Sequence, residues 1–130
     1  MNIDSQVPSL FLCDSHTLTE GHYHEFRFPL SELPAELLAQ LSAVGPVDLI
    51  VTRHQGKPKA WFNVCPHLGR PLNVAPNRFL VDEHNQLICC VHGAVFEPNQ
   101  GKCVSGPCLN AHLKAVAIEE TEGKVSVRLS

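Results

Sequence analysis

Two short cysteine–histidine clusters constrain this chain more than any other feature of its sequence. They read CPHLG at residues 65–69 and CCVHG at residues 89–93. A helix presents two ligands on one face at spacings of three or four residues, which the C-x-H of the first cluster does not meet. Pro66 favours extended backbone at the residue before it, and the glycine after each histidine permits a tight turn. The clusters are therefore predicted to be two ligand-bearing loops.

The residue types in these loops indicate metal binding. Two cysteines and two histidines can bind zinc tetrahedrally, or hold a [2Fe–2S] cluster in which two histidines ligate one iron. Zinc sites usually pair like ligands in sequence, whereas here each loop carries one cysteine and one histidine. The mixed loops favour a cluster whose two irons need different ligands. A structural zinc site remains the alternative.

On these motifs the chain resembles the Rieske family over residues 47–129. The matching stretches are CPHLGRPL, then CCVHGAVFEPNQGKCVSGP, and then a closing pair of strands. The resemblance implies one [2Fe–2S] cluster as the cofactor. It also implies that Cys65 and Cys89 bind the inner iron, and that His67 and His92 bind the outer iron nearer the surface.

The remaining cysteines of this region are interpreted through the same resemblance. The family's C-x-x-H spacing fits Cys89 and not Cys90, which is expected to be a small buried residue. Cys103 and Cys108 flank a Gly-Pro segment that is similar to a third loop covering the cluster. We predict that both are free thiols, because the cytoplasm keeps thiols reduced.

Two departures from the respiratory members of the family predict a low reduction potential. Those members place a serine directly after the second His-Gly and a tyrosine two positions later, where this chain has Ala94 and Phe96. They also join their ligand loops by a disulfide, at positions that are Arg70 and Val91 here. Without the two hydroxyls, backbone N–H groups are the expected donors to the cluster sulfurs, and a loop-to-loop disulfide is not possible.

The fold class predicted for residues 1–130 is all-β. We expect a single Rieske domain of antiparallel sheets, with a cluster-binding subdomain of two ligand loops at about 63–108 and one short helix at 31–42. Alternation and turn residues place the strands. The expected strands are 9–13, 23–28, 47–53, 59–64, 79–81, 87–89, 94–96, 115–119 and 124–129.

Charge and hydropathy exclude several classes of partner. The net charge of −3 lacks the basic footprint of a nucleic-acid-binding protein. Residues 1–12 have neither a basic flank nor a long apolar run, so we expect no signal peptide, no membrane contact and a cytoplasmic location.

The resemblance implies a small ferredoxin-like electron carrier. Such a protein passes single electrons from a flavin reductase to an oxygenase. The alternative is a small Rieske subunit of a nitrite reductase-like oxidoreductase. We expect no catalysis by the chain alone, since only His112 follows His92 and a second iron site would need two histidines and a carboxylate.

Overall fold

The computed structural model describes residues 9–33, 35 and 47–128, which form ten strands and two 3-10 turns. The turns are η2 (Ser15–Thr17) and η3 (Leu30–Glu32). The strands are β1 (Ser9–Asp14), β2 (Tyr23–Phe28), β3 (Val47–His54), β4 (Lys57–Phe62), β5 (Leu80–Val81), β6 (Leu87–Ile88), β7 (Val95–Phe96), β8 (Cys103–Ser105), β9 (Ile118–Thr121) and β10 (Lys124–Arg128). Most of the helix predicted at 31–42 lies outside the described residues, and η3 covers its beginning.

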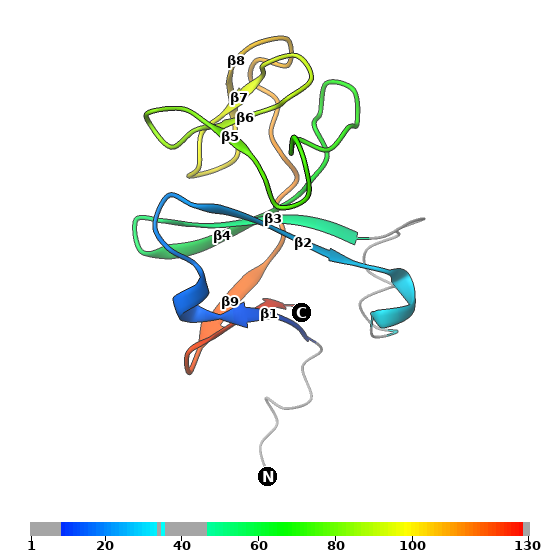
Figure 1. The fold of residues 1–130 in the computed structure, drawn as a ribbon, viewed down its shortest axis with the longest axis vertical. Coiled ribbons are helices and arrows are strands. Elements are labelled where there is room, and N and C mark those ends of the chain that lie inside the picture. The colour runs from blue at the N-terminus through cyan, green and yellow to red at the C-terminus, as the bar shows by residue number, and fades with distance from the viewer. Residues whose placement is uncertain (1–8, 34, 36–46, 129–130) are drawn as a thin grey trace.

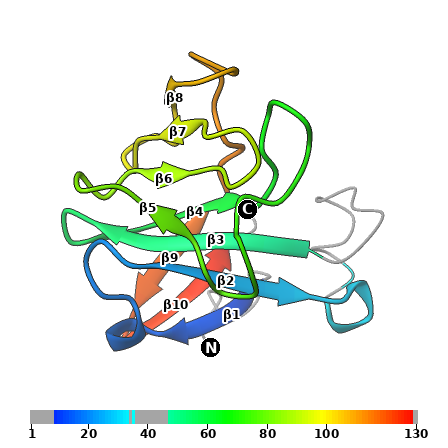
Figure 2. The same ribbon diagram turned by 45° about the horizontal axis from the view of Figure 1, so that its top comes forward.

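Three antiparallel sheets form successive layers. Their strand orders are β1-β10-β9, β2-β3-β4 and β5-β6-β7-β8. Figure 1 shows the four-stranded sheet at one end of the molecule, the β2-β3-β4 sheet in the middle and the third sheet at the other end, and Figure 2 shows β10 within that last layer. The prediction of an all-β, antiparallel fold is confirmed.

Strand β3 lies between two separate parts of the core. Because successive side chains of a strand point to opposite faces, Leu49 and Val51 pack into a core shared with β1 and β10. Ile50 points the other way, into a core shared with the four-stranded sheet. A strand buried on both faces needs a continuous apolar run, and Leu-Ile-Val at 49–51 supplies it.

Two tight hairpins set the register within the two three-stranded sheets. Gln55 and Gly56 have φ of 53° and 80°, and Glu122 and Gly123 have φ of 53° and 77°. Two consecutive residues with positive φ are typical of the type I′ turn, whose twist suits a two-residue hairpin. Each hairpin joins two strands that the sequence predicted in this part of the chain. The first pairs Trp61 with Ile50, which places the indole in the core below the four-stranded sheet.

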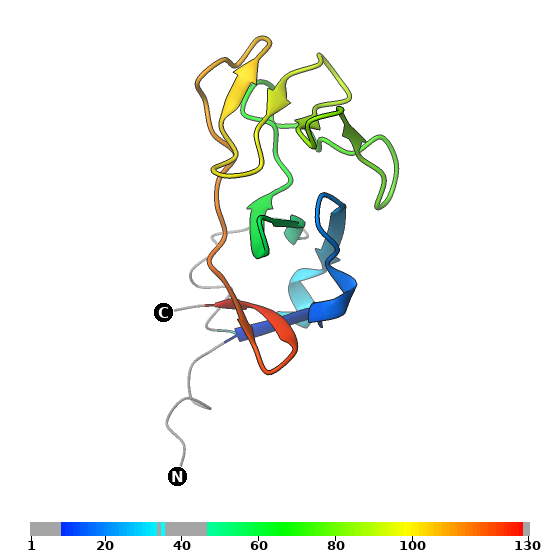
Figure 3. The same cartoon turned by 90° about the vertical axis from the view of Figure 1, so that its left-hand side faces the viewer.

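The four-stranded sheet is made of strands only two or three residues long. Figure 3 shows it at one end of the molecule, with the green stretch after β4 and the orange stretch before β9 running between it and the rest. Because its strands are so short, loops make up most of this end of the molecule. Both cysteine–histidine clusters lie in these loops.

Candidate metal centre

The first cysteine–histidine loop closes directly after β4. The Cys65 N–H donates to the Arg70 carbonyl oxygen at 2.8 Å, and the Gly69 N–H donates to the Cys65 carbonyl oxygen at 2.7 Å. Gly69 has φ of +72°, a conformation that glycine adopts without steric cost. The backbone therefore folds back on itself within six residues and presents the His67 side chain at the turn.

The second loop repeats the same backbone hydrogen bonds. The Cys89 N–H donates to the Ala94 carbonyl oxygen at 2.8 Å, and the Gly93 N–H donates to the Cys89 carbonyl oxygen at 3.0 Å. Gly93 has φ of +74°, close to the value at Gly69. The two clusters thus adopt one turn geometry, and their histidines differ by a single position within it.

The two loops bring their histidines together. The ring centroids of His67 and His92 lie 5.0 Å apart, and the rings meet edge to face at 74°. Both imidazoles are exposed, whereas Cys65 and Cys89 are only 2% and 3% exposed. The sequence-predicted residues therefore form an inner pair of thiols and an outer pair of imidazoles.

The electrostatics of Cys65 reflect this inner position. Burial raises the pKa of the Cys65 thiol, and the neighbouring Cys89 thiol raises it further. Hydrogen bonds from the backbone N–H groups of His67 and Leu68 act in the opposite direction, because they favour a negative charge on the sulfur. These two N–H groups would remain donors to a thiolate that ligates a metal.

This donor set fits a [2Fe–2S] cluster. A cluster with two histidines takes one pair of protein ligands on each iron, and the inorganic sulfides complete the coordination of both irons. No group of three or more His, Cys, Asp and Glu side chains within residues 9–33, 35 and 47–128 has the arrangement of a mononuclear site. The structure instead supplies two different pairs of possible ligands. One pair is the buried cysteine sulfurs, which are soft, and the other is the exposed imidazole nitrogens, which are harder.

A third loop, at residues 103–111, packs on the second ligand loop. A Cβ placed on Gly106 would lie 2.8 Å from the Ala94 Cα, so only glycine allows this approach to the second loop. Cys108, on the same loop, lies beside Cys103, and their Sγ atoms are 3.4 Å apart. Burial, followed by the Cys103 thiol, raises the pKa of Cys108 to about 12. None of the six cysteines is joined in a disulfide in the structure.

The Cys90 thiol is engaged with the backbone at the end of the first loop. Its Sγ donates to the Asn73 carbonyl oxygen at 3.2 Å, and its backbone N–H donates to the Leu72 carbonyl oxygen at 3.3 Å. The side chain is half-buried rather than fully buried. This contact ties the second loop to the end of the first.

Sequence reasoning missed the residue that supports the first loop from below, Asn63. Its side chain is 2% exposed, accepts from the Leu72 N–H at 2.8 Å, and donates to Asn73 Oδ1 at 2.8 Å. Its Nδ2 also lies 3.3 Å from Asp48 Oδ2. A buried amide must satisfy several partners at once, so Asn63 fixes where the first loop ends. An asparagine two residues before the first ligand cysteine was the available signal.

Asp48 lies below Asn63 and makes the stability of the protein depend on pH. Its buried Oδ1 has no hydrogen-bond partner, and burial together with the adjacent Glu25 carboxyl raises the pKa of Asp48 to about 7. A raised pKa means that the folded state binds this proton more tightly than the unfolded state does. The stabilisation is thus complete below about pH 4 and is lost as the pH rises through 7.

Asp48→Asn, which mimics the protonated carboxyl, should remove that pH dependence. We expect the variant to be more stable than wild type at pH 8 by about 1–2 kcal/mol, since solvent screens a half-buried carboxyl and one proton serves both Asp48 and Glu25. Urea unfolding at pH 4.5, 6 and 8 measures this difference. Asp14→Asn, which changes an exposed carboxyl on β1, controls for the loss of one negative charge. A constant difference between Asp48→Asn and wild type across this range would contradict the assignment.

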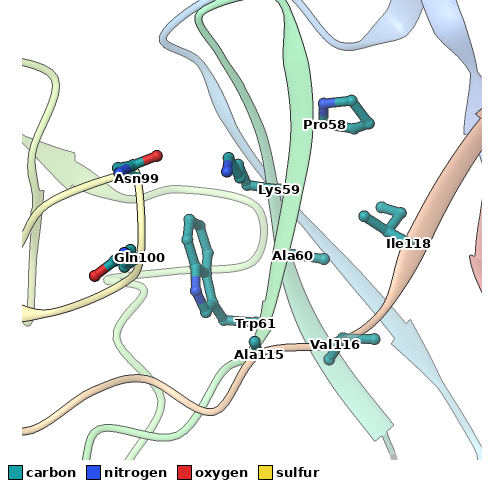
Figure 4. Close-up of a pocket in the computed structure, with 9 residues that line it drawn as sticks. All are labelled: Pro58, Lys59, Ala60, Trp61, Asn99, Gln100, Ala115, Val116 and Ile118. Atoms are coloured by element: carbon teal, nitrogen blue, oxygen red, sulfur yellow. The ribbon is translucent and has the colours of Figure 1, made fainter.

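A separate hollow of about 300 Å³ lies beside β4, between residues 99–100 and 115–118. Figure 4 shows the Trp61 indole standing next to Gln100 in this hollow. A Cβ on Gly101 would lie 2.5 Å from Trp61 Nε1, which explains the glycine at that turn. The hollow is lined by no cysteine or histidine, so it is distinct from the candidate metal centre.

The fold and these two loops define a class of protein, an all-β protein with paired Cys–His loops for a binuclear iron–sulfur cluster. The sequence profile of the Rieske [2Fe-2S] domain family matches residues 12–120, and the chain belongs to this family. Its cofactor is a single [2Fe–2S] cluster. A comparison with the sequences of curated proteins finds no match.

Several solved structures share the fold. The ferredoxin of carbazole 1,9a-dioxygenase from Nocardioides aromaticivorans IC177 is 15% identical, with a TM-score of 0.65, and the match covers 95% of this chain and 99% of that chain. The terminal oxygenase of the same system is 18% identical, with a TM-score of 0.66, but the 95% of this chain that matches covers only 30% of the oxygenase. A chain in a complex of reduced oxygenase and oxidized ferredoxin is 23% identical, with a TM-score of 0.63 and 92% coverage of both chains.

The described helical segments include none with the length and hydropathy needed to cross a lipid bilayer.

Proposed function

We propose that this protein is a small electron carrier whose [2Fe–2S] cluster is held by Cys65, His67, Cys89 and His92. The observation that carries the proposal is the pair of exposed imidazoles, 5.0 Å apart, above two buried thiols on loops of identical backbone geometry. When bound, the cluster accepts and releases one electron at a time. The buried cysteines would hold the inner iron away from water, and the exposed imidazole edges would give the electron a short path to a partner.

The proposed acceptor is an oxygenase, and the proposed donor is a flavin reductase. The acceptor is supported by the fold matches, which include a dioxygenase ferredoxin covered over 99% of its length and a complex of oxygenase with ferredoxin. A flavin reductase is a suitable donor because it splits a two-electron reductant into single electrons. We propose a cytoplasmic location, which the six free thiols support.

We further propose that residues 1–130 form one domain with its cluster-binding part at about 63–108. Strand β3 supports this proposal, since Leu49 and Val51 belong to one core and Ile50 to the other. Separating the two cores would expose one face of β3, so they are expected to unfold together.

The surface around the imidazoles is suited to docking a redox partner. Leu68 and Val91, on the two ligand loops, are 52% and 37% exposed, and Leu109, on the third loop, is 57% exposed. Exposed apolar side chains that gather on one group of loops commonly mark an interaction site. A partner that covers these side chains would bring its own redox centre close to His67 and His92.

Leu68→Glu should therefore slow electron transfer without changing the cluster. The reduced protein is mixed by stopped flow with an oxygenase isolated from the same cells, and reoxidation of the cluster is followed by visible absorption. We expect the second-order rate constant to fall at least tenfold, because docking would bury the introduced carboxylate.

Phe11→Glu is the matched control for this experiment. Phe11 has the same 52% exposure, but it lies on β1 in the sheet at the opposite end of the molecule. Equal rate constants for Leu68→Glu and Phe11→Glu would exclude docking at the imidazole surface. If the protein is isolated only in tight association with a large redox subunit, the nitrite reductase-like alternative replaces the carrier function.

A further inference from the structure

The two ligand loops are each closed by their own hydrogen bonds, but these bonds do not set the separation of the loops. The Cys65 N–H donates to the Arg70 carbonyl oxygen within the first loop, and the Cys89 N–H donates to the Ala94 carbonyl oxygen within the second. On the ligand assignment proposed above, each iron takes one ligand from each loop. The distance and the angle between the loops therefore decide whether both irons can be held.

Cys90 makes two hydrogen bonds that join the loops. It follows the proposed ligand Cys89 directly in the second loop. Its backbone N–H donates to the Leu72 carbonyl oxygen at 3.3 Å, and its S–H donates to the Asn73 carbonyl oxygen at 3.2 Å. Leu72 and Asn73 follow shortly after the first loop closes at Arg70. Cys90 thus holds two consecutive carbonyl groups of the chain that leaves the first loop.

The side chain of Asn63 fixes these two residues in turn. Its Oδ1 accepts from the Leu72 N–H at 2.8 Å, and its Nδ2 donates to Asn73 Oδ1 at 2.8 Å. The Asn63 N–H donates to the Asp48 carbonyl oxygen at 2.9 Å, which extends the pairing of β3 and β4 by one residue. Asn63 is 2% exposed and Leu72 is fully buried, so water does not replace these partners. A continuous line of hydrogen bonds therefore runs from β3 through Asn63 and residues 72–73 to Cys90.

We propose that Cys90 and Asn63 are positioning residues for the cluster, which hold the second ligand loop against the first at the separation that the two irons require. The inference rests on the four ligands proposed above, and neither Cys90 nor Asn63 is one of them. Metal ligands work only where surrounding contacts hold them in place, and loss of such an outer-shell contact commonly costs 10–100-fold in metal affinity. The S–H of Cys90 therefore has a specific role, whereas the sequence alone suggested only a small buried residue.

The rate at which the cluster is lost tests this inference. Holoprotein purified anaerobically is mixed with an iron chelator, and the decay of the visible absorption gives the rate constant. Cys90→Val fills the site without a donor, and we expect it to be coloured when isolated and to lose the cluster about tenfold faster than wild type. Cys90→Ser restores a donor and should lose the cluster at nearly the wild-type rate. Cys13→Val is the matched control, because Cys13 is a buried cysteine in the core on the other side of β3.

Two further measurements separate positioning from a general effect on stability. The g values of the reduced cluster in electron paramagnetic resonance depend on ligand geometry, so they should shift in Cys90→Val and return toward wild type in Cys90→Ser. Asn73→Ala removes the acceptor of the Asn63 amide and should also speed cluster loss, without leaving the buried Leu72 N–H unpaired. Because Asn73 and Cys90 belong to one line of hydrogen bonds, the double variant should lose the cluster little faster than the faster single variant. If Cys90→Val is isolated without a cluster, Cys90→Ala carries the same comparisons.

Any of four results would overturn the inference. The first is an equal rate of cluster loss in wild type and Cys90→Val, and the second is unchanged g values in Cys90→Val. The third is a rate in Cys90→Ser as high as that in Cys90→Val, because the S–H would then not be the group that matters. The fourth is an effect of Asn73→Ala that multiplies that of Cys90→Val, because the two residues would then act independently. Failure of the ligand proposal looks different, since the cluster would then survive loss of Cys89 or His92 itself.

Discussion

Replacing either His67 or His92 with alanine is expected to abolish the visible spectrum of the cluster. On the proposed ligand assignment, each variant would leave the outer iron with one protein ligand. The imidazole that is removed is the one that lies 5.0 Å from the remaining ring. Loss of a first ligand should exceed the 10–100-fold effect on affinity that is typical of an outer-shell contact. Visible absorption, electron paramagnetic resonance, and iron and sulfide content of anaerobically purified protein measure the outcome.

The adjacent cysteines provide a matched control for this experiment. Cys90→Ala should retain iron and colour, because the Cys90 thiol is engaged with the Asn73 carbonyl oxygen, whereas Cys89→Ala should lose both. A normal spectrum in both His67→Ala and His92→Ala would refute the ligand assignment. Loss of the cluster in Cys90→Ala, with retention in Cys89→Ala, would exchange the roles of the two cysteines.

The midpoint potential is expected at the low end of the Rieske range, roughly −150 mV to slightly below zero. The respiratory members of the family carry hydroxyl donors at the two positions that are Ala94 and Phe96 in this chain. Both of these side chains are 1% exposed. A buried alanine and a buried phenylalanine cannot donate to the cluster sulfurs. A potential in this range suits electron transfer from a flavin to an oxygenase and does not suit oxidation of a quinol.

Ala94→Ser should shift the midpoint upward by introducing one of the missing donors. Direct protein-film voltammetry at neutral pH measures the shift. Ala60→Ser is the matched control, since Ala60 is a buried alanine in the core on the other side of β3. A wild-type midpoint well above about +100 mV, near the middle of the family range, would contradict both the hydrogen-bond argument and the carrier function.

Local sequence was sufficient to predict most strands and their turns. The hairpins at Gln55-Gly56 and Glu122-Gly123 depend on backbone conformations that are encoded within a few residues. The apolar run at 49–51 predicted a buried strand, but its side chains alternate between two cores that were not distinguishable in the sequence. Which face of β3 meets which sheet depends on strands far away in the chain.

The ligand loops show the same difference between features that local sequence predicts and features that it does not. The six-residue turn of the two loops recurs at 97–102, where the Glu97 N–H donates to the Lys102 carbonyl oxygen and Gly101 donates back to Glu97. That third turn carries no cysteine or histidine, so turn geometry alone does not make a metal site. The cysteine and the histidine within the turn make the metal site, and these residue types are visible in the sequence.

The sequence by itself therefore determined the family, the cofactor and the two loops, because each cysteine and its histidine lie within four consecutive residues. Only the tertiary structure decided which distant groups surround them. It placed His67 against His92, Asn63 beneath the first loop, and Gly106 against Ala94. Each of these contacts joins residues separated by between nine and twenty-five positions, and chain packing rather than local pattern brings them together.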